Sequence, residues 1–583
     1  DGLAEGMTPA QAAGIVAKFA KTVELPPVPE PETALPPPAT PPAQPIPSGA
    51  PFVCLGFNEG IYYYQPDSTG QVISLSRASH TGTNLLSIAP LAYWETLYPS
   101  KTGANWLAAA SSLFETQAAV GIFSADRIRG RGAWWDASRP VLHLGDRILA
   151  DSKTHLALKP FDSRYLYQRM APLKGPGTAS PLTDSEALML CELAERFHWE
   201  VPASGLLLAG WVTLAPICGA LQWRPHVWLT AAAGSGKSAI LDRYVAPLLA
   251  DMGLIVAGNT TEAGLRQTLR SDARPVVFDE AESNEKADQL RMQSILSLAR
   301  VASSESSATM LKGSPSGDVT RFNVRSMFLM SSIATALKQG ADRSRFAQLT
   351  LRSPTDMPKA ERMAHWEALD RDLDRYITSD IALRLIARTV AQIPIIRQSV
   401  RVFSRAASER FDSQRLGDQY GTLLAGAWSL MSSEVPTDQQ ARDLIDQNNW
   451  ESYSQSTEVP DERRCIQRIL QHQVRVEAND KTYTRTLGEL VEIVSLQSTD
   501  IDVSSVKAQS TLGRHGLRVD QQASLLQISN TAEALATILK DTPWGHSWAT
   551  VLSRLPGATK AGAVRFKGAG TVSRAVALQI QGL

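Results

Sequence analysis

Apolar and polar positions alternate along the chain in blocks that predict both strands and helices. From 226 to about 352, short apolar runs such as HVWLT (226–230) are followed by longer stretches with helical spacing. This order is typical of an α/β nucleotide-binding sheet. Residues 355–450 show helical spacing throughout, as in RMAHWEALDRDLDRYI, so we expect an all-helical region there. The capping-box pattern TDSE (183–186) predicts the start of a further helix.

The first part of the chain is mixed in character. Residues 8–20 read as a short helix, and a proline-dense stretch that cannot form a core follows it. FVCLGFNEGIYYYQP and GQVISLS predict strands of a hairpin around DSTG, NWLAAASSLFETQAAVG predicts a helix, and RPVLHLGDRIL returns to strand. We expect residues 1–25 to be the end of an upstream module, 26–50 a linker, and 51–175 an N-terminal α+β domain.

The C-terminal segment predicts three short helices, DERRCIQRILQHQ, RTLGELVEIV and SSVKAQSTLGRHGLRV, and GLRVDQQASLLQIS alternates like a two-stranded wing. Three helices and a wing are typical of a winged-helix domain, which binds either DNA or protein. The candidate DNA contacts are Lys507, Arg514, His515 and Arg518. A second basic surface is expected beyond them, from Arg554, Lys560, Arg565, Lys567 and Arg574.

Composition and charge exclude few classes of function. The chain has 583 residues, and its 58 basic and 58 acidic side chains give no net charge, so any nucleic-acid site must gather its basic residues locally. The four cysteines lack metal-site spacing, which favours a reducing compartment such as the cytoplasm and argues against a zinc site. The apolar run at 205–221 predicts a buried helix, the alternative being a short membrane span.

The stretch LTAAAGSGKSAILDRY (229–244) carries the strongest chemical signal. An apolar strand candidate precedes it and a helix follows, which is the context that a phosphate-binding loop requires. The loop opens with Ala231 where glycine is usual, but at the strand exit a positive φ is least needed. Lys237 would contact the β- and γ-phosphates of ATP and Ser238 would bind Mg²⁺. The candidate nucleotide-binding residues are Ala233, Gly234, Ser235, Gly236, Lys237, Ser238 and Ala239.

A second motif, RPVVFDEAES (274–283), is a short apolar strand that ends in two acids. Asp279 is placed to hold the magnesium shell, and Glu280 to polarise the attacking water as a general base. An acidic pair directly after a strand also points to an ATPase of the additional-strand type.

Three features after the acids suggest what ATP drives. ATMLKGSPSGDVTRFNV (308–324) predicts a hairpin with Lys312 near its tip as a phosphate contact, the alternative being an ordinary exposed hairpin. Ser331 and Ser332 end the next strand, where a water-orienting sensor residue is expected. SRF (344–346) resembles the arginine-finger motif of minichromosome maintenance helicases. The resemblance implies that Arg345 is the finger toward a neighbouring subunit, with Arg343 as its rival and a surface arginine pair as the alternative.

A third basic stretch, RIRGRGAWWD (127–136), allows two interpretations. Its arginines and tryptophans could grip a nucleic-acid backbone and stack bases, or they could form a turn beside two core tryptophans.

Taken together, WVTLAPICGALQWRPHVWLTAAAGSGKS, NTTEAGLRQTL, RPVVFDEAES, RFNVRSMFLMSSI and DRSRF resemble the helicase part of phage and mobile-element primase–helicase proteins. These are related to minichromosome-maintenance-like and superfamily 3 helicases. The resemblance implies an AAA+ core over 176–352 with a β-hairpin before the sensor strand. It also implies a helical lid over 353–455 and a winged-helix domain over 456–583.

The function that the resemblance implies is a hexameric, ATP- and Mg²⁺-dependent motor that unwinds forked or single-stranded DNA, with a primase module possible upstream and no membrane. Two alternatives stay open: an ATP-switched initiator or remodeller that binds DNA without unwinding it, and a nucleotide-dependent defence or signalling scaffold.

Overall fold

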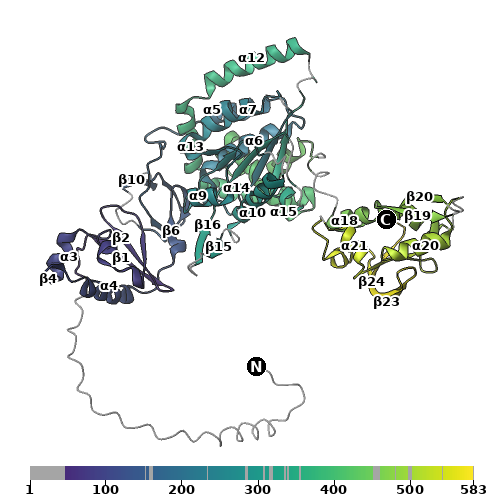
Figure 1. Cartoon of the computed structure of the whole chain (residues 1–583). Helices are drawn as coiled ribbons and strands as arrows, with labels where there is room; N and C mark the ends of the chain where they lie inside the picture. Colours follow the sequence, from purple (N-terminus) through teal and green to yellow (C-terminus); the bar gives the residue numbers. More distant parts are fainter. Residues whose placement is uncertain are drawn as a thin grey trace, which may run out of the picture. The chain divides into compact units, whose positions relative to one another are not determined.

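The computed structural model (Figure 1) describes residues 46–150, 153–156, 162–232, 234–281, 286–305, 309–313, 319–333, 337, 340–353, 356, 358–450, 453, 460–478, 481–496, 502–540 and 542–581. The helix expected at 8–20 and almost all of the proline-rich linker lie outside these residues. The described residues form two compact units, one that contains 46–66 with Ile73–Phe123 and one that contains Asp67–Val72 with the described part of 124–583.

The first unit is built on an antiparallel sheet in the order β1-β2-β3. The expected hairpin around DSTG is present, because β2 and β3 pair antiparallel on either side of it. The first predicted strand is in addition divided at Glu59 and Gly60, whose positive φ angles of 48° and 79° make a tight turn. Asn105 caps the main helix by accepting from the Ala108 amide. The elements are β1 (Phe52–Asn58), β2 (Ile61–Pro66), β3 (Ile73–Ser76), α2 (Gly82–Leu85), α3 (Leu91–Leu97), β4 (Pro99–Ser100), β5 (Gly103–Ala104) and α4 (Trp106–Val120).

Residues 124–175 belong to the second unit, whereas the sequence grouped them with 51–123. Their backbone is bonded to a later segment: the Gly130 amide donates to Ser271 O (2.9 Å) and the Ala273 amide to Arg131 O (2.8 Å). They form a sheet in the order β10-β9-β8-β7. The elements are β6 (Ile128–Arg129), β7 (Gly132–Asp136), β8 (Arg139–His143), β9 (Arg147–Ala150), β10 (Lys153–Leu156) and β11 (Leu166–Tyr167).

The arginines beside the two tryptophans serve this packing. Arg131 forms a 2.6 Å ion pair with the buried Asp272. Arg129 is buried, and its guanidinium lies over the rings of Tyr165 (3.8 Å) and Trp134 (4.9 Å). The structure therefore favours the second interpretation, a turn beside core tryptophans. Arg129 and Arg131 are engaged within the fold and do not form a nucleic-acid-binding surface.

The second unit centres on a five-stranded parallel sheet in the order β13-β14-β17-β12-β18. Alternate residues of β12 enter different cores: Val227 and Leu229 pack with α5 and α6, while Trp228 packs with α9 and α10. This confirms the expected α/β class with a parallel sheet. The strands are β12 (His226–Thr230), β13 (Leu254–Val256), β14 (Val276–Phe278), β17 (Phe328–Ser332) and β18 (Phe346–Thr350), and the helices are α5 (Asp184–Glu195), α6 (Ala203–Leu214), α9 (Glu262–Leu269) and α10 (Lys286–Ala302).

A long helical region follows the sheet and continues its core. Gly210 of α6 and Gly426 of α15 lie so close that a Cβ at Gly210 would come within 2.0 Å of Leu423 O. The apolar window Ala203–Ala220, the one stretch of the described chain long and apolar enough to span a membrane, is 94% buried in this packing. The helices are α12 (Lys359–Tyr376), α13 (Ser379–Ala391), α14 (Ile393–Phe411), α15 (Gln414–Met431) and α16 (Asp438–Asp446).

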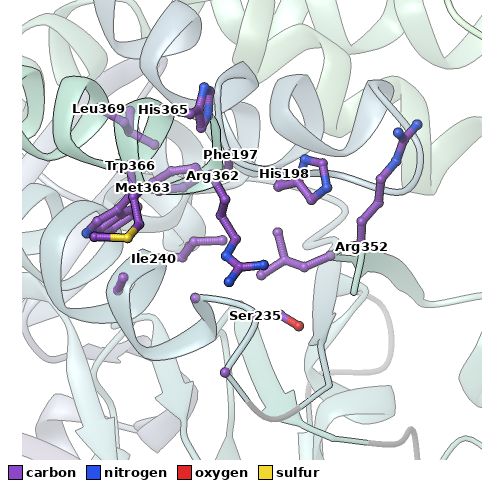
Figure 2. Close-up of a pocket in the computed structure, with 14 residues that line it drawn as sticks. Phe197, His198, Ser235, Ile240, Arg352, Arg362, Met363, His365, Trp366 and Leu369 are labelled. Carbon is purple, nitrogen blue, oxygen red and sulfur yellow. The ribbon is translucent and has the colours of Figure 1, made fainter. Parts of the chain in front are cut away.

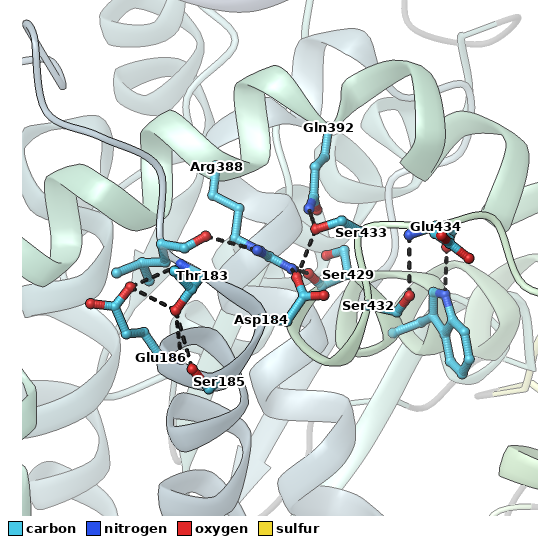
Figure 3. A network of polar contacts seen from close by, with 12 residues as sticks. Thr183, Asp184, Ser185, Glu186, Arg388, Gln392, Ser429, Ser432, Ser433 and Glu434 are labelled. Atoms are coloured by element: carbon cyan, nitrogen blue, oxygen red, sulfur yellow. Dashed lines mark hydrogen bonds and ion pairs between the residues drawn. The ribbon is translucent and has the colours of Figure 1, made fainter.

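Arg388 of α13 ties this helical region to the start of α5 (Figure 3). Its buried guanidinium donates to the carbonyls of Leu182 (2.8 Å) and Ser429 (2.9 Å) and pairs with Asp184 (2.6 Å). The Thr183–Glu186 capping box that the sequence predicted is present at the same helix end.

We expect Arg388→Met to lower the free energy of unfolding by about 2–3 kcal/mol, because it removes the Arg388 donor from two carbonyls and leaves Asp184 with the Ser433 hydroxyl alone. The shift of the urea midpoint measures this. Arg384→Met is the matched control, since Arg384 lies one turn earlier and its side chain is more exposed than that of Arg388 (19% against 4%), so its loss should be smaller. Equal midpoints for both variants would contradict this role for Arg388.

The C-terminal segment contains more strand than expected. The wing strands β21 and β22 pair as the alternation predicted, but they belong to a four-stranded sheet in the order β21-β22-β24-β23. The hairpin β19–β20 was missed by the sequence reading. The elements are α18 (Asp461–Leu470), β19 (Gln473–Ala478), β20 (Lys481–Thr486), α19 (Leu487–Ser495), α20 (Ser505–Arg514), β21 (Leu517–Asp520), β22 (Leu525–Ser529), α21 (Glu533–Ile538), α22 (Trp548–Leu552), β23 (Thr559–Phe566) and β24 (Thr571–Gln579).

Candidate nucleotide-binding site

The GSGKS loop leaves β12 at the carboxyl edge of the parallel sheet and enters α7 (Lys237–Ile240). Gly234 and Gly236 take φ angles of 79° and 91°, which glycine adopts without strain. Ala231 is buried and does not have a positive φ, so its methyl group is tolerated as expected. A Cβ at either glycine would meet no protein atom within 4 Å; the backbone conformation, and not packing, requires glycine here. Ala233 lies outside the described residues.

A cavity of about 380 Å³ lies over this loop. Its floor is formed by Gly234, Ser235, Gly236 and Ala239. Figure 2 shows Arg362 extending from α12 toward the loop that carries Ser235. The remaining lining residues are Phe197, His198, Ile240, Leu351, Arg352, Met363, His365, Trp366 and Leu369. The cavity thus joins a glycine-rich floor to basic and apolar walls.

The two acids follow β14 at the same edge of the sheet. Asp279 Oδ1 accepts a hydrogen bond from the hydroxyl of Ser331 (3.0 Å) and another from the Glu280 amide (2.9 Å). Ser332 points to the other face, where its hydroxyl accepts from Trp228 Nε1 (2.7 Å). Ser331 thus contacts the acidic pair directly, through Asp279.

Glu280 has an unusual backbone. Its φ is +56°, a strained conformation for a residue with a side chain, and its side chain is exposed. A Cβ on Gly258 would come within 3.1 Å of Glu280 O, so the loop after β13 lies against this residue. Strain of this kind in a non-glycine residue is found most often at functional sites.

Arg343 and Arg345 lie at the opposite edge of the sheet. The His226 amide, at the amino end of β12, donates to Arg345 O (3.2 Å), whereas the phosphate loop follows the carboxyl end of the same strand. At about 3.3 Å per residue, β12 separates them by roughly 13 Å. Arg345 is half-buried, and burial, with Arg415 and Arg300 nearby, lowers its pKa. Arg343 Nη1 donates to Leu337 O (3.2 Å).

The expected hairpin is present between α10 and β17 as β15 (Thr309–Gly313) and β16 (Val319–Asn323), with Lys312 opposite Thr320. Its turn lies outside the described residues. In the C-terminal segment, Arg514 is exposed and Lys507, His515 and Arg518 are half-buried. The structure does not bring these residues to the nucleotide loop.

Several residues of the cavity were missed from the sequence. Arg352 follows β18, and Arg362 and Trp366 lie on α12 about 130 residues after the loop. His198 comes from the connection between α5 and α6, and burial beside Arg352 lowers the pKa of its imidazole. No local motif marks these positions; only the parallel pairing of β18 with β12 predicts that the segment after β18 returns to the loop.

No family model and no curated protein matches the chain. Among solved structures, it is similar to the active helicase Cch of SCCmec type IV, with 12% sequence identity and a TM-score of 0.38 over 91% of this chain and 93% of that chain. It is also similar to the apo C-terminal region of NrS-1, with 10% identity and a TM-score of 0.27 over 75% of this chain and 96% of that one. Both are distant likenesses.

Proposed function

We propose that the chain is an ATP-hydrolysing motor of the AAA+ type that forms a ring and unwinds DNA. The observation that carries the proposal is that the GSGKS loop and the hydrogen-bonded pair Asp279–Ser331 follow parallel strands at the same edge of the sheet. The loop also lines a cavity together with Arg352 and Arg362. Strand β17 lies between the loop strand β12 and the acid strand β14, as an additional-strand ATPase requires.

The residues present fit a nucleoside triphosphate with Mg²⁺. The loop amides and Lys237 suit the phosphates, while Arg352 and Arg362 add positive charge on the other side of the cavity. Ser238 and Asp279 would hold Mg²⁺, which supplies charge neutralisation on the phosphates. Ser331 fixes the orientation of Asp279, which leaves Glu280 as the acid free to accept a proton from water.

The position of Arg345 supports a ring. The sheet separates Arg345 from the phosphate loop of its own chain. As an arginine finger, Arg345 would therefore reach the phosphate loop of a neighbouring copy. A contact between opposite edges of two copies is heterologous, and heterologous contacts close into rings when the rotation allows. A hexamer, with α12 as the lid over the loop, is the assembly that we propose.

Motion along DNA is assigned to the β15–β16 hairpin. We expect Lys312→Ala to leave basal ATP hydrolysis within about two-fold of the original. DNA-stimulated hydrolysis and unwinding of a forked duplex should each fall by at least about ten-fold, because every subunit loses one phosphate contact. Hydrolysis and strand-displacement assays with the same preparation measure both effects.

Lys312→Arg is the control, since it keeps the charge and should keep unwinding. Unchanged unwinding by Lys312→Ala would refute the role of the hairpin. DNA-stimulated hydrolysis without any strand separation by the unaltered protein would favour the initiator or remodeller instead. The proposed setting is the cytoplasm during replication of a phage or mobile element.

A further inference from the structure

The last 42 residues carry no acidic side chain. From 542 to 583 the chain has neither Asp nor Glu, yet it contains five basic residues. All five are exposed: Arg554, Lys560, Arg565, Lys567 and Arg574. Within the part of the chain that the structure describes, no ion pair engages any of the five. A surface of this composition has strong positive potential, because nothing beside it neutralises the charge.

Most of these residues lie on the hairpin β23–β24, which extends beyond the main core of the C-terminal segment. In β24, Val576 and Leu578 belong to that core, whereas Val572 nearer the turn is 56% exposed. The opposite face of the hairpin is closed by a small cluster of its own, Val564, Phe566 and Ala575. The hairpin is therefore held rigid while one of its faces stays open to solvent.

The register places two arginines on this open face. Arg565 is opposite Val572, and Ala563 is opposite Arg574. Directly opposed residues of an antiparallel pair share a face, and so do residues two apart along a strand. Arg565 and Arg574 are thus diagonal neighbours, about 7–8 Å apart at their backbones.

The turn of the hairpin packs against α20, the helix that carries Lys507 and Arg514. A Cβ on Gly513 of α20 would come within 1.7 Å of Lys567 O, and a Cβ on Gly568 within 2.4 Å of Ser510 O. These two glycines permit a backbone-to-backbone approach that no other residue would allow. The exposed face of α20, with Val506 82% exposed, consequently lies next to the basic hairpin.

We propose that the β23–β24 hairpin binds the phosphate backbone of duplex DNA beside α20, and that it is the principal DNA-contacting wing of this domain in place of β21–β22. This inference rests on the proposed action on DNA and names a contact surface for it. A protein partner would present both charges, whereas a row of cations without acids suits a continuous polyanion. The side-by-side placement of helix and hairpin suits a duplex, which offers a groove and a flanking backbone.

The test is the double variant Arg565→Gln/Arg574→Gln in the full chain, with binding to a labelled duplex measured by fluorescence anisotropy without nucleotide over a range of salt. We expect about ten-fold weaker binding, and a slope of log affinity against log salt that is smaller by about 2, since two phosphate contacts are lost. Basal ATP hydrolysis should not change. Arg565→Lys/Arg574→Lys should retain binding, because phosphate contact needs charge and not a particular shape.

The matched control is Arg475→Gln/Lys481→Gln, which removes the same charge from the exposed hairpin β19–β20 and should leave affinity and slope unchanged. Equal losses in both double variants would mean a general charge effect and overturn the assignment. A loss of binding confined to single-stranded DNA would also overturn the assignment. The same holds if polyglutamate displaces the labelled duplex as effectively as unlabelled DNA does. If Arg565→Gln/Arg574→Gln binds the duplex as tightly as the unaltered protein, the hairpin is not the DNA contact, but the motor proposal still stands. If the unaltered protein does not bind DNA at all, both proposals are wrong.

Discussion

Glu280→Gln should reduce the turnover of ATP by about 10²–10⁴-fold while leaving the apparent affinity for ATP almost unchanged. Oδ1 of Asp279 already accepts from the Ser331 hydroxyl and from the Glu280 amide, so the carboxylate is held in an orientation suited to a metal and not to accepting a proton. The exposed Glu280 is the remaining acid of the pair. Glutamine keeps its size but cannot act as a base.

Steady-state hydrolysis with and without DNA gives the turnover, and a fluorescent nucleotide gives the affinity. Glu361→Gln is a fitting control because Glu361 is an exposed acid on α12, next to the cavity-lining Arg362. Normal hydrolysis by Glu280→Gln would mean that another group activates the water. Loss of nucleotide binding, in contrast, would assign Glu280 to the site's structure and not to the chemical step.

The conformation of the GSGKS loop was predictable because its signal is local. The glycine spacing reflects two positive φ angles, and the strand before the loop and the helix after it are contiguous in sequence. The acids at the end of β14 are predictable for the same reason. Alternation along β17 also implies that Ser331 and Ser332 face opposite sides of the sheet, but it does not say which side holds Asp279.

The features that the sequence did not predict correctly depend on tertiary contacts between segments far apart in the chain. Arg129 and Arg131 resemble a nucleic-acid grip in sequence, but Asp272, more than 140 positions later, pairs with Arg131 inside the fold. The cationic wall of the nucleotide cavity comes from the segment after β18. Likewise, the Gly513 and Gly568 contacts that join α20 to the hairpin have no counterpart in any local pattern.

Arg345→Ala should lower turnover by about 10³–10⁵-fold, as loss of an arginine finger does. The local charges fit this role: Arg345 lies near two cations, Arg300 and Arg415, and one anion, the buried Asp342, which is also paired with Arg300 (3.3 Å). An anion supplied by a neighbouring copy would relieve the repulsion among these cations. Arg343→Ala is the comparison, and it should have a smaller effect because Arg343 bonds the Leu337 carbonyl of its own chain.

Mixing two inactive variants separates a finger that acts between subunits from a residue that only supports the fold. Lys237→Ala lacks a working loop and Arg345→Ala lacks the finger, so neither alone has a complete site. In rings assembled from equal amounts of both, about one quarter of the interfaces pair an intact loop with an intact finger. Hydrolysis should therefore reappear on mixing, well above the mean of the two separate variants. If both variants melt like the original protein and the mixture stays inactive, Arg345 does not act across a subunit interface, and the ring loses its main structural support.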